Sequence, residues 1–131
     1  MPGMHDIDDY PDAEQMPGLL VFRYDAPLCF ANAQDFRARV LAAVDSQPEP
    51  VEWLLLNAEA IVELDTTAVD ALRQLAGDLA RRHVVFAMAR VKQDLRRQQV
   101  RGELMDIIDE DRIYPTLPVS LEAFERWREH R

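Results

Sequence analysis

The chain has 131 residues, of which 48% are hydrophobic and 30% are charged, and this length and composition suit one compact domain with a single core. Its formal net charge of −9, from 24 acidic residues against 15 Lys and Arg, argues against general binding to nucleic acid or to anionic lipid. The apolar residues lie in short runs, whereas a membrane-spanning helix needs about 20 mostly apolar residues. We therefore expect one globular domain that does not itself cross a membrane.

The first residues are acidic and differ in composition from the rest of the chain. We interpret residues 1–17, which contain three prolines, as a tail or a short edge strand, and residues 18–131 as the folded domain. The start lacks the basic residues and apolar stretch of a secretory signal, and the lone cysteine, Cys29, cannot form an internal disulfide. Both features favour the cytosol.

Apolar runs alternate with amphipathic patterns along the domain. Strands are predicted at residues 19–24, 51–56, 84–89 and 113–114, with a further short strand at 28–30. Helices are predicted from an Asn32 cap to about residue 46, from an Asp65 cap to about residue 83, over 91–108, and from a Ser120 cap onward. Val119 is expected to pack on Phe124 as a hydrophobic staple. This order predicts an α/β fold: a small mixed sheet, mostly parallel, with about four helices packed against it and an antiparallel edge from the N-terminal segment.

The sequence contains no recognisable catalytic or metal-binding motif. His5, His83 and His130 are too far apart for a local metal site, and no second cysteine exists to complete a zinc site. The four glycines cannot build a Walker loop or a dinucleotide fingerprint. We therefore expect neither an enzyme nor a metal protein, and no required cofactor.

The loops that follow the strands are the natural place for a ligand or partner. They cover residues 26–32, 58–67 and 89–92, and helix N-termini there offer unpaired N–H groups to a phosphate, sulfate or carboxylate. The candidate ligand or partner contacts are Asn32, Asp65, Thr66, Thr67, Arg90 and Lys92. Helix capping alone also explains the aspartate. Residues 90–101 carry five basic residues against one acidic residue. We interpret this run either as a solvated helix face or as a docking surface for an anion or an acidic partner.

Residues 26–33, Ala-Pro-Leu-Cys-Phe-Ala-Asn-Ala, together with Phe36, resemble the strand-to-helix junction of STAS domains in SulP-type sulfate permeases. The order of strands and helices over residues 19–131 follows the same family. The resemblance implies a non-catalytic cytoplasmic domain of an integral membrane transporter of sulfate or a related anion, at the inner face of the plasma membrane. The implied partners are the membrane domain of the permease and other cytosolic proteins. A nucleotide, GTP or ATP, is an implied ligand, with Thr66, Arg90 and Lys92 as its candidate contacts.

A second branch of the same family offers an alternative. Residues 65–68, Asp-Thr-Thr-Ala, resemble the Asp-Ser-Ser-Gly type sequence of anti-sigma-factor antagonists, in which the first serine is phosphorylated. Threonine keeps a hydroxyl that a kinase can modify, so Thr66 is the candidate for a phosphorylation switch. Both serines and the glycine of that pattern are replaced here, the glycine by Ala68. The alternative function is a phosphorylation-switched anti-sigma-factor antagonist.

Overall fold

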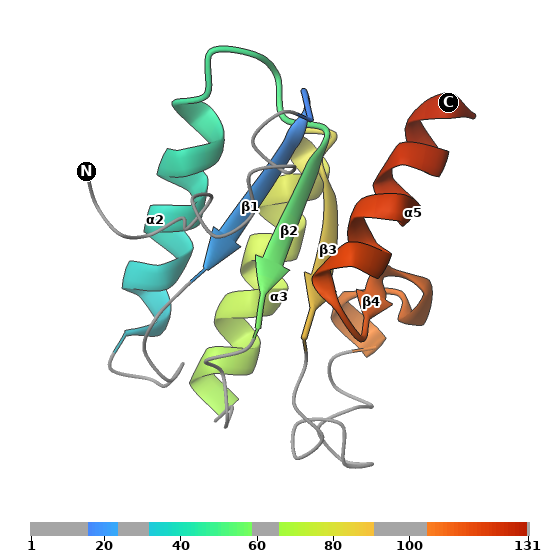
Figure 1. Cartoon of the computed structure of the whole chain (residues 1–131). Coiled ribbons are helices and arrows are strands. Elements are labelled where there is room, and N and C mark those ends of the chain that lie inside the picture. Colours follow the sequence, from blue (N-terminus) through green and yellow to red (C-terminus); the bar gives the residue numbers. More distant parts are fainter. Residues whose placement is uncertain (1–15, 24–31, 59–65, 91–104, 131) are drawn as a thin grey trace.

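Four parallel strands form the sheet, in the spatial order β1-β2-β3-β4 (Figure 1). The computed structural model describes residues 16–23, 32–58, 66–90 and 105–130. Within them the strands are β1 (Leu19–Arg23), β2 (Trp53–Asn57), β3 (Val85–Ala89) and β4 (Ile113–Tyr114). The helices are α2 (Ala33–Asp45), α3 (Thr66–Arg81) and α5 (Leu117–Glu129), and a short 3-10 helix, η3 (Glu110–Arg112), precedes β4. The predicted α/β class with a mostly parallel sheet is confirmed.

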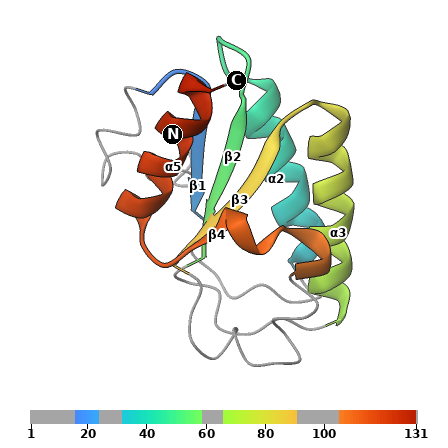
Figure 2. The ribbon, with the colours of Figure 1, turned by 90° about the vertical axis from the view of Figure 1, so that its right-hand side faces the viewer.

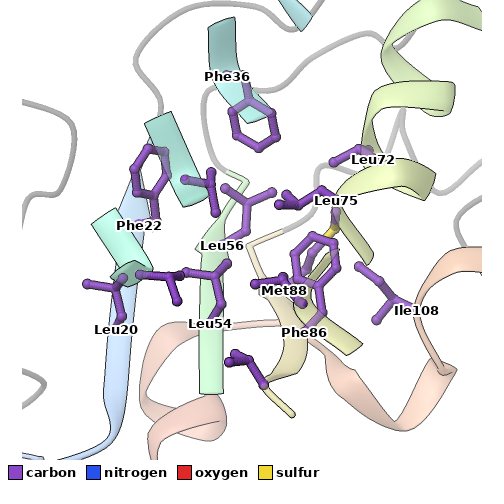
Figure 3. Close-up of a cluster of buried hydrophobic side chains, with 14 of the residues drawn as sticks. Leu20, Phe22, Phe36, Leu54, Leu56, Leu72, Leu75, Phe86, Met88 and Ile108 are labelled. Atoms are coloured by element: carbon purple, nitrogen blue, oxygen red, sulfur yellow. The ribbon is translucent and has the colours of Figure 1, made fainter. Parts of the chain in front are cut away.

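Helices cover both faces of the sheet. Figure 2 shows α2 and α3 on one side and α5 on the other. Successive strand side chains point to opposite faces, so each strand supplies both layers. On the α2/α3 side, the main core contains strand residues Leu20, Phe22, Leu54, Leu56, Phe86 and Met88 with helical residues that include Phe36, Leu72 and Leu75 (Figure 3). All five residues of β2 are buried, as expected for a strand covered on both sides.

A smaller core lies beneath α5. It contains the strand residues Val21, Trp53, Leu55, Ala87 and Ala89, together with Tyr114, Leu117 and Phe124. Tyr114 belongs to the edge strand β4, and Leu117 and Phe124 belong to α5. Among the residues that the structure describes, α5 is the helix that holds this second layer against the sheet, and the aromatic side chains beneath it supply much of the buried surface.

The end of α3 follows from local backbone geometry. His83 has φ +60°, the left-handed conformation that commonly ends helices. The N–H of Val84 donates to the carbonyl of Leu79 at 2.9 Å, and the N–H of His83 donates to that of Ala80 at 3.0 Å, which together form a Schellman motif. The chain then enters β3 with only Val84 between the motif and the strand. The interpretation of His83 as a helix-end residue agrees with this geometry.

The start of α5 differs from the prediction. The helix begins at Leu117, and its cap is Thr116, whose Oγ1 accepts from the N–H of Val119 at 3.3 Å. The predicted cap, Ser120, lies inside the helix, where its buried hydroxyl donates to the carbonyl of Leu117 at 2.6 Å. Val119 is 38% exposed, so the predicted staple on Phe124 is wrong as well. The physical reason is Pro118, which fits the first helical turn because no N–H is needed there.

Other boundaries shift by one or two residues. Asn32 occupies the predicted N-cap position of α2, but its side chain makes no cap hydrogen bond. The helix ends at Asp45, with Ser46 as C-cap, as predicted. Residues 105–107 are helical and residue 108 is not, so the helix predicted over 91–108 ends one residue early. Residues 91–104 of that prediction lie outside the described residues, as do the strand predicted at 28–30 and residues 1–15 of the acidic segment. Within the described part of the chain, no helix has the length and apolarity needed to span a bilayer.

Gly18 precedes β1 and marks the place where the pairing of β1 with β2 begins. Its φ is +88°, and its carbonyl accepts from the N–H groups of Glu52 at 2.6 Å and Trp53 at 3.0 Å. A Cβ at this position would meet the Glu52 side chain, whose flexible end can move away. The requirement for glycine therefore comes from the backbone conformation.

Candidate functional site

Strand ends and helix starts gather at the carboxyl edge of the sheet. In Figure 1 the strands point towards the edge at which α2 and α3 begin. Asn32 precedes α2, Thr66 and Thr67 open α3, and Arg90 follows β3. These four predicted contacts therefore share one edge, as the parallel topology requires. Asp65 and Lys92, the other two predicted contacts, lie outside the described residues.

Side chains at this edge differ in exposure. Thr66 and Thr67 are exposed, whereas Asn32 and Arg90 are half-buried. Ala68, the next residue of α3, is 0% exposed and belongs to the main core, so its methyl group packs inward. The position that holds glycine in the antagonist pattern is therefore occupied here by Ala68, whose side chain is part of the core. Phosphorylation of Thr66 stays a prediction, for which the exposed hydroxyl is a necessary condition.

Arg90 has an unusual backbone conformation. Its φ is +62°, in the left-handed region that non-glycine residues seldom adopt. Its N–H donates to the carbonyl of Tyr114 at 3.1 Å, and the N–H of Ala58 donates to the carbonyl of Ala89 at 2.8 Å. These two bonds tie the end of β3 to both neighbouring strands. The backbone of Arg90 is consequently held by sheet contacts, and a cationic residue is placed at the carboxyl edge.

A second polar site, which the sequence analysis did not identify, lies between α2 and α3. It is an open groove of ≈ 410 Å³. Its lining residues are Arg37, Asp70, Arg73, Gln74, Gly77, Asp78 and Arg81. All but the first of these belong to α3. The groove runs between the helices on the side away from the sheet, and its lining is mostly charged.

Asp78 is the central acid of this groove. Its side chain is 7% exposed; its Oδ2 accepts from Arg37 Nε at 2.7 Å, and its Oδ1 pairs with Arg81. The hydrogen bond from Arg37 holds the pKa of Asp78 below its ordinary value, although burial acts in the opposite direction. The pair spacing 78 to 81 is a normal helical ion pair that sequence can suggest, whereas the Arg37 contact joins residues 41 positions apart.

A second ion pair joins the last residue of α2 to the residue that follows α3. Arg82 donates through Nε and Nη2 to the two carboxylate oxygens of Asp45, each at 3.0 Å. This bidentate contact lowers the pKa of Asp45. The same arginine donates through Nη1 to the main-chain carbonyl of Asp78 at 3.3 Å. The two helices are thus joined at their outer surface by charged contacts as well as through the core.

The comparison with known families decides the identity of the fold. The family model described as the STAS domain matches residues 10–119. This chain belongs to the STAS domain family. The resemblance to STAS domains of SulP-type permeases, drawn from residues 26–33 and the element order, is confirmed. Among the described residues of this STAS domain, no group of three or more His, Cys, Asp or Glu side chains is placed to hold a metal ion.

Several relatives of the STAS domain are proteins named as sulfate transporters. It is 62% identical over 124 residues to a protein named a probable sulfate transporter of Mycobacterium tuberculosis, a match that covers 95% of this chain and 22% of that protein. It is 26% identical over 126 residues to high affinity sulfate transporter 2 of Stylosanthes hamata, covering 90% of this chain and 19% of that protein. The chain therefore spans about a fifth of the length of these relatives.

Solved structures show the same fold. The STAS domain of a SulP transporter from Vibrio cholerae superposes with a TM-score of 0.73 at 17% identity, covering 96% of this chain and all of that one. The murine Solute Carrier 26 family member A9 anion transporter gives a TM-score of 0.77 at 18% identity, over 92% of this chain and 20% of that one. A putative anti-sigma factor antagonist from Thermotoga maritima gives 0.66 at 14% identity, over 82% of this chain and 88% of that one. At these identities the likeness concerns the fold alone.

Proposed function

We propose that this STAS domain is the non-catalytic regulatory and interaction domain of a SulP-type transporter of sulfate or a related anion, on the cytoplasmic side of the membrane. The observation that carries the proposal is the 62% identity, over 95% of this chain, to a probable sulfate transporter. Identity at that level along nearly the whole domain favours a common role over a shared fold only. The membrane domain of the permease is the proposed principal partner, with other cytosolic proteins as further partners.

The carboxyl edge is the surface we assign to that role. Loops at the carboxyl ends of parallel strands are the part of such a fold that can vary without loss of the core. Exposed Thr66 and Thr67 at the start of α3, with Arg90 beside the end of β3, present hydroxyl, N–H and cationic groups at one edge. These groups suit recognition by hydrogen bonding and charge rather than by burial of apolar surface.

Removal of residues 18–131 from the full-length permease is the direct test. We expect loss of most sulfate uptake, of transporter abundance in the membrane, or of both, because the domain is proposed to support transport through contacts with the membrane part. Radiolabelled sulfate uptake and quantitative immunoblotting of membranes measure the two effects. Arg126→Gln, on the exposed side of α5, serves as a matched control and should change neither. Unchanged uptake with unchanged abundance after deletion would contradict the proposal.

A nucleotide or another anion is the proposed ligand of the same edge. The N–H groups in the first turn of α3 and the positive end of its dipole favour a phosphate group, and Arg90 adds a positive charge. Titration of the ¹⁵N-labelled chain with ATP, GTP and inorganic phosphate is expected to shift the amide signals of Thr66, Thr67 and Arg90. Arg90→Gln should weaken the affinity for these compounds by about two- to fivefold, the range of one charge contact that water can reach. The absence of shifts at these amides with all three compounds would reject this ligand site.

A further inference from the structure

A groove opens at the amino edge of the sheet, the edge at which the strands begin. This amino-edge groove has a volume of ≈ 270 Å³ and is lined by residues 16–20 and 47–51. The first segment leads into β1, and the second connects α2 to β2. Figure 1 shows that this connection lies at the opposite end of the sheet from the starts of α2 and α3. Because small-molecule sites have volumes of about 300–1,000 Å³, the groove suits a single side chain better than a nucleotide.

Both walls of the amino-edge groove have constrained backbones. Residues 16–19 form a type II turn, with Gly18 at φ +88° and a hydrogen bond of 3.2 Å from the N–H of the last residue to the carbonyl of the first. The carbonyl of Gly18 also accepts from the chain that leads into β2, so the two walls are joined. On the other wall, Pro48 and Pro50 fix φ at two positions. A groove that is already ordered loses little conformational entropy when a partner binds.

The amino-edge groove offers an excess of hydrogen-bond acceptors. Three of its ten lining residues are prolines, each of which has a carbonyl but no N–H. Within the described part of the chain, the carbonyls of Pro48, Glu49 and Pro50 accept no hydrogen bond, and the Glu49 carboxylate forms no ion pair. All three residues are exposed, so a partner can reach them. None of the described residues that line the groove is basic, and its polar groups therefore favour a cationic partner with several donors.

Apolar side chains complete the lining of the groove. Leu20 belongs to the main core and Val51 packs against it, whereas Met16 and Leu19 pack against the core beneath α5. A hydrated inorganic cation gains little from such walls. The aliphatic stem of arginine can pack on them while its head stays at the polar rim, and its planar fork of donors serves several acceptors better than the point charge of lysine.

We infer that the amino-edge groove is a docking site for an arginine-bearing segment of a cytosolic protein, whose arginine packs its stem against Leu19 and Val51 and directs its guanidinium to Glu49. The net charge of −9 of the chain attracts a basic segment. Under the proposed function the membrane domain is assigned to the carboxyl edge, so the partner at the opposite edge is a separate, cytosolic protein. A single charge contact that water can reach makes the interaction weak and sensitive to salt.

The probe is the peptide acetyl-Gly-Gly-Arg-Gly-Gly-amide, titrated into the ¹⁵N-labelled chain, with citrulline in place of arginine as its neutral counterpart. We expect the arginine peptide to shift the amide signals of Gly18, Leu19 and Val51, and to bind about two- to fivefold more tightly than the citrulline peptide. Glu49→Gln should remove that difference by weakening the binding of the arginine peptide alone. Glu125→Gln, which changes an exposed acid of α5 to its amide in the same way, should leave both affinities unchanged.

Three results of this titration would overturn the inference. They are equal affinity for both peptides, equal losses in Glu49→Gln and Glu125→Gln, and tighter binding of methylguanidinium or calcium chloride than of the arginine peptide. The first two would show that the Glu49 carboxylate recognises no charge, and the third that the apolar walls hold no side-chain stem. The titration tests the groove whether or not deletion of the domain impairs transport.

Photo-cross-linking in the full-length permease tests the source of the segment. With Pro48 replaced by a benzophenone amino acid, we expect an adduct with a soluble protein, joined at a peptide that contains arginine and identified by mass spectrometry. The yield of this adduct should fall when Glu49→Gln is added. An adduct with the membrane domain of the permease, an adduct between two copies of the chain, or no adduct would contradict a cytosolic partner.

Discussion

Trp53→Ala is expected to lower the free energy of unfolding by about 3–5 kcal/mol, because it removes the largest buried side chain of the core beneath α5. The indole is 0% exposed, and its ring centroid lies 5.4 Å from that of Phe124, 5.8 Å from that of Trp127 and 6.4 Å from that of Tyr114. The guanidinium of Arg112 lies 4.9 Å from the same ring. One residue therefore joins β2, β4, η3 and α5.

Urea denaturation followed by far-UV circular dichroism measures this effect without depending on tryptophan fluorescence. Trp53→Phe is the matched variant. Within the described chain the Nε1 of Trp53 has no hydrogen-bond partner, so the phenyl ring forfeits no hydrogen bond and loses only part of the volume. We expect a loss of about 1–2 kcal/mol for this change. Equal losses for the two variants, or a loss below about 1 kcal/mol for Trp53→Ala, would show that packing against α5 does not stabilise the sheet as described.

Asp78→Ala is expected to lower the free energy of unfolding by about 2 kcal/mol. The value lies between that of an exposed ion pair and that of a fully buried one, because the side chain of Asp78 is 7% exposed whereas that of Arg37 is 30% exposed. The variant removes the acceptor for two arginines, which then depend on water. Asp45→Asn, in the more exposed pair with Arg82, should have a much smaller effect in the same urea titration. A larger loss for Asp45→Asn than for Asp78→Ala would contradict this account.

The same carboxylate predicts a pH dependence. Its pKa in the folded chain lies below the ordinary value of 3.8, so the unfolded chain binds the proton more readily. The stabilisation is accordingly complete above pH 3.8 and is lost as the pH falls from there through the lower folded pKa. Below pH 3.8 the difference in stability between the native sequence and Asp78→Asn should shrink. A difference that stayed constant as the pH fell through this range would exclude Asp78 as the titrating group.

The candidate contacts at the carboxyl edge could be predicted because they depend on a topological rule. Once residues 53–57 and 85–89 are recognised as parallel strands, the starts of the helices and the residues after the strands must meet at one edge. That argument needs only the order of elements. The order of elements predicts this without knowledge of which strand residues pair with each other. Asn32, Thr66, Thr67 and Arg90 could therefore be placed at one edge although their individual contacts were unknown.

The α2/α3 groove could not be predicted in the same way. Its central contact joins Arg37 to Asp78, and nothing in either local sequence specifies a partner on another helix. In a sequence, both residues are typical of solvated helix faces. The groove exists because α2 and α3 pack side by side on one face of the sheet, at a rotation set by the fit of core residues such as Phe36 and Leu75.

The sequence by itself determined the alternation of strands and helices, the burial of β2 on both faces and the apolar stripe of α3, because these depend on residue periodicity and on side-chain chemistry within a few turns. It also contained the residues that identify the family. Only the tertiary structure decided the start of α5, the aromatic cluster around Trp53 and the ion pairs between helices. The sequence predicted a start at a Ser120 cap, whereas the helix begins at Leu117 and buries Leu117 and Phe124 in the core beneath α5. Contacts between distant residues depend on how the elements pack, which no local pattern encodes.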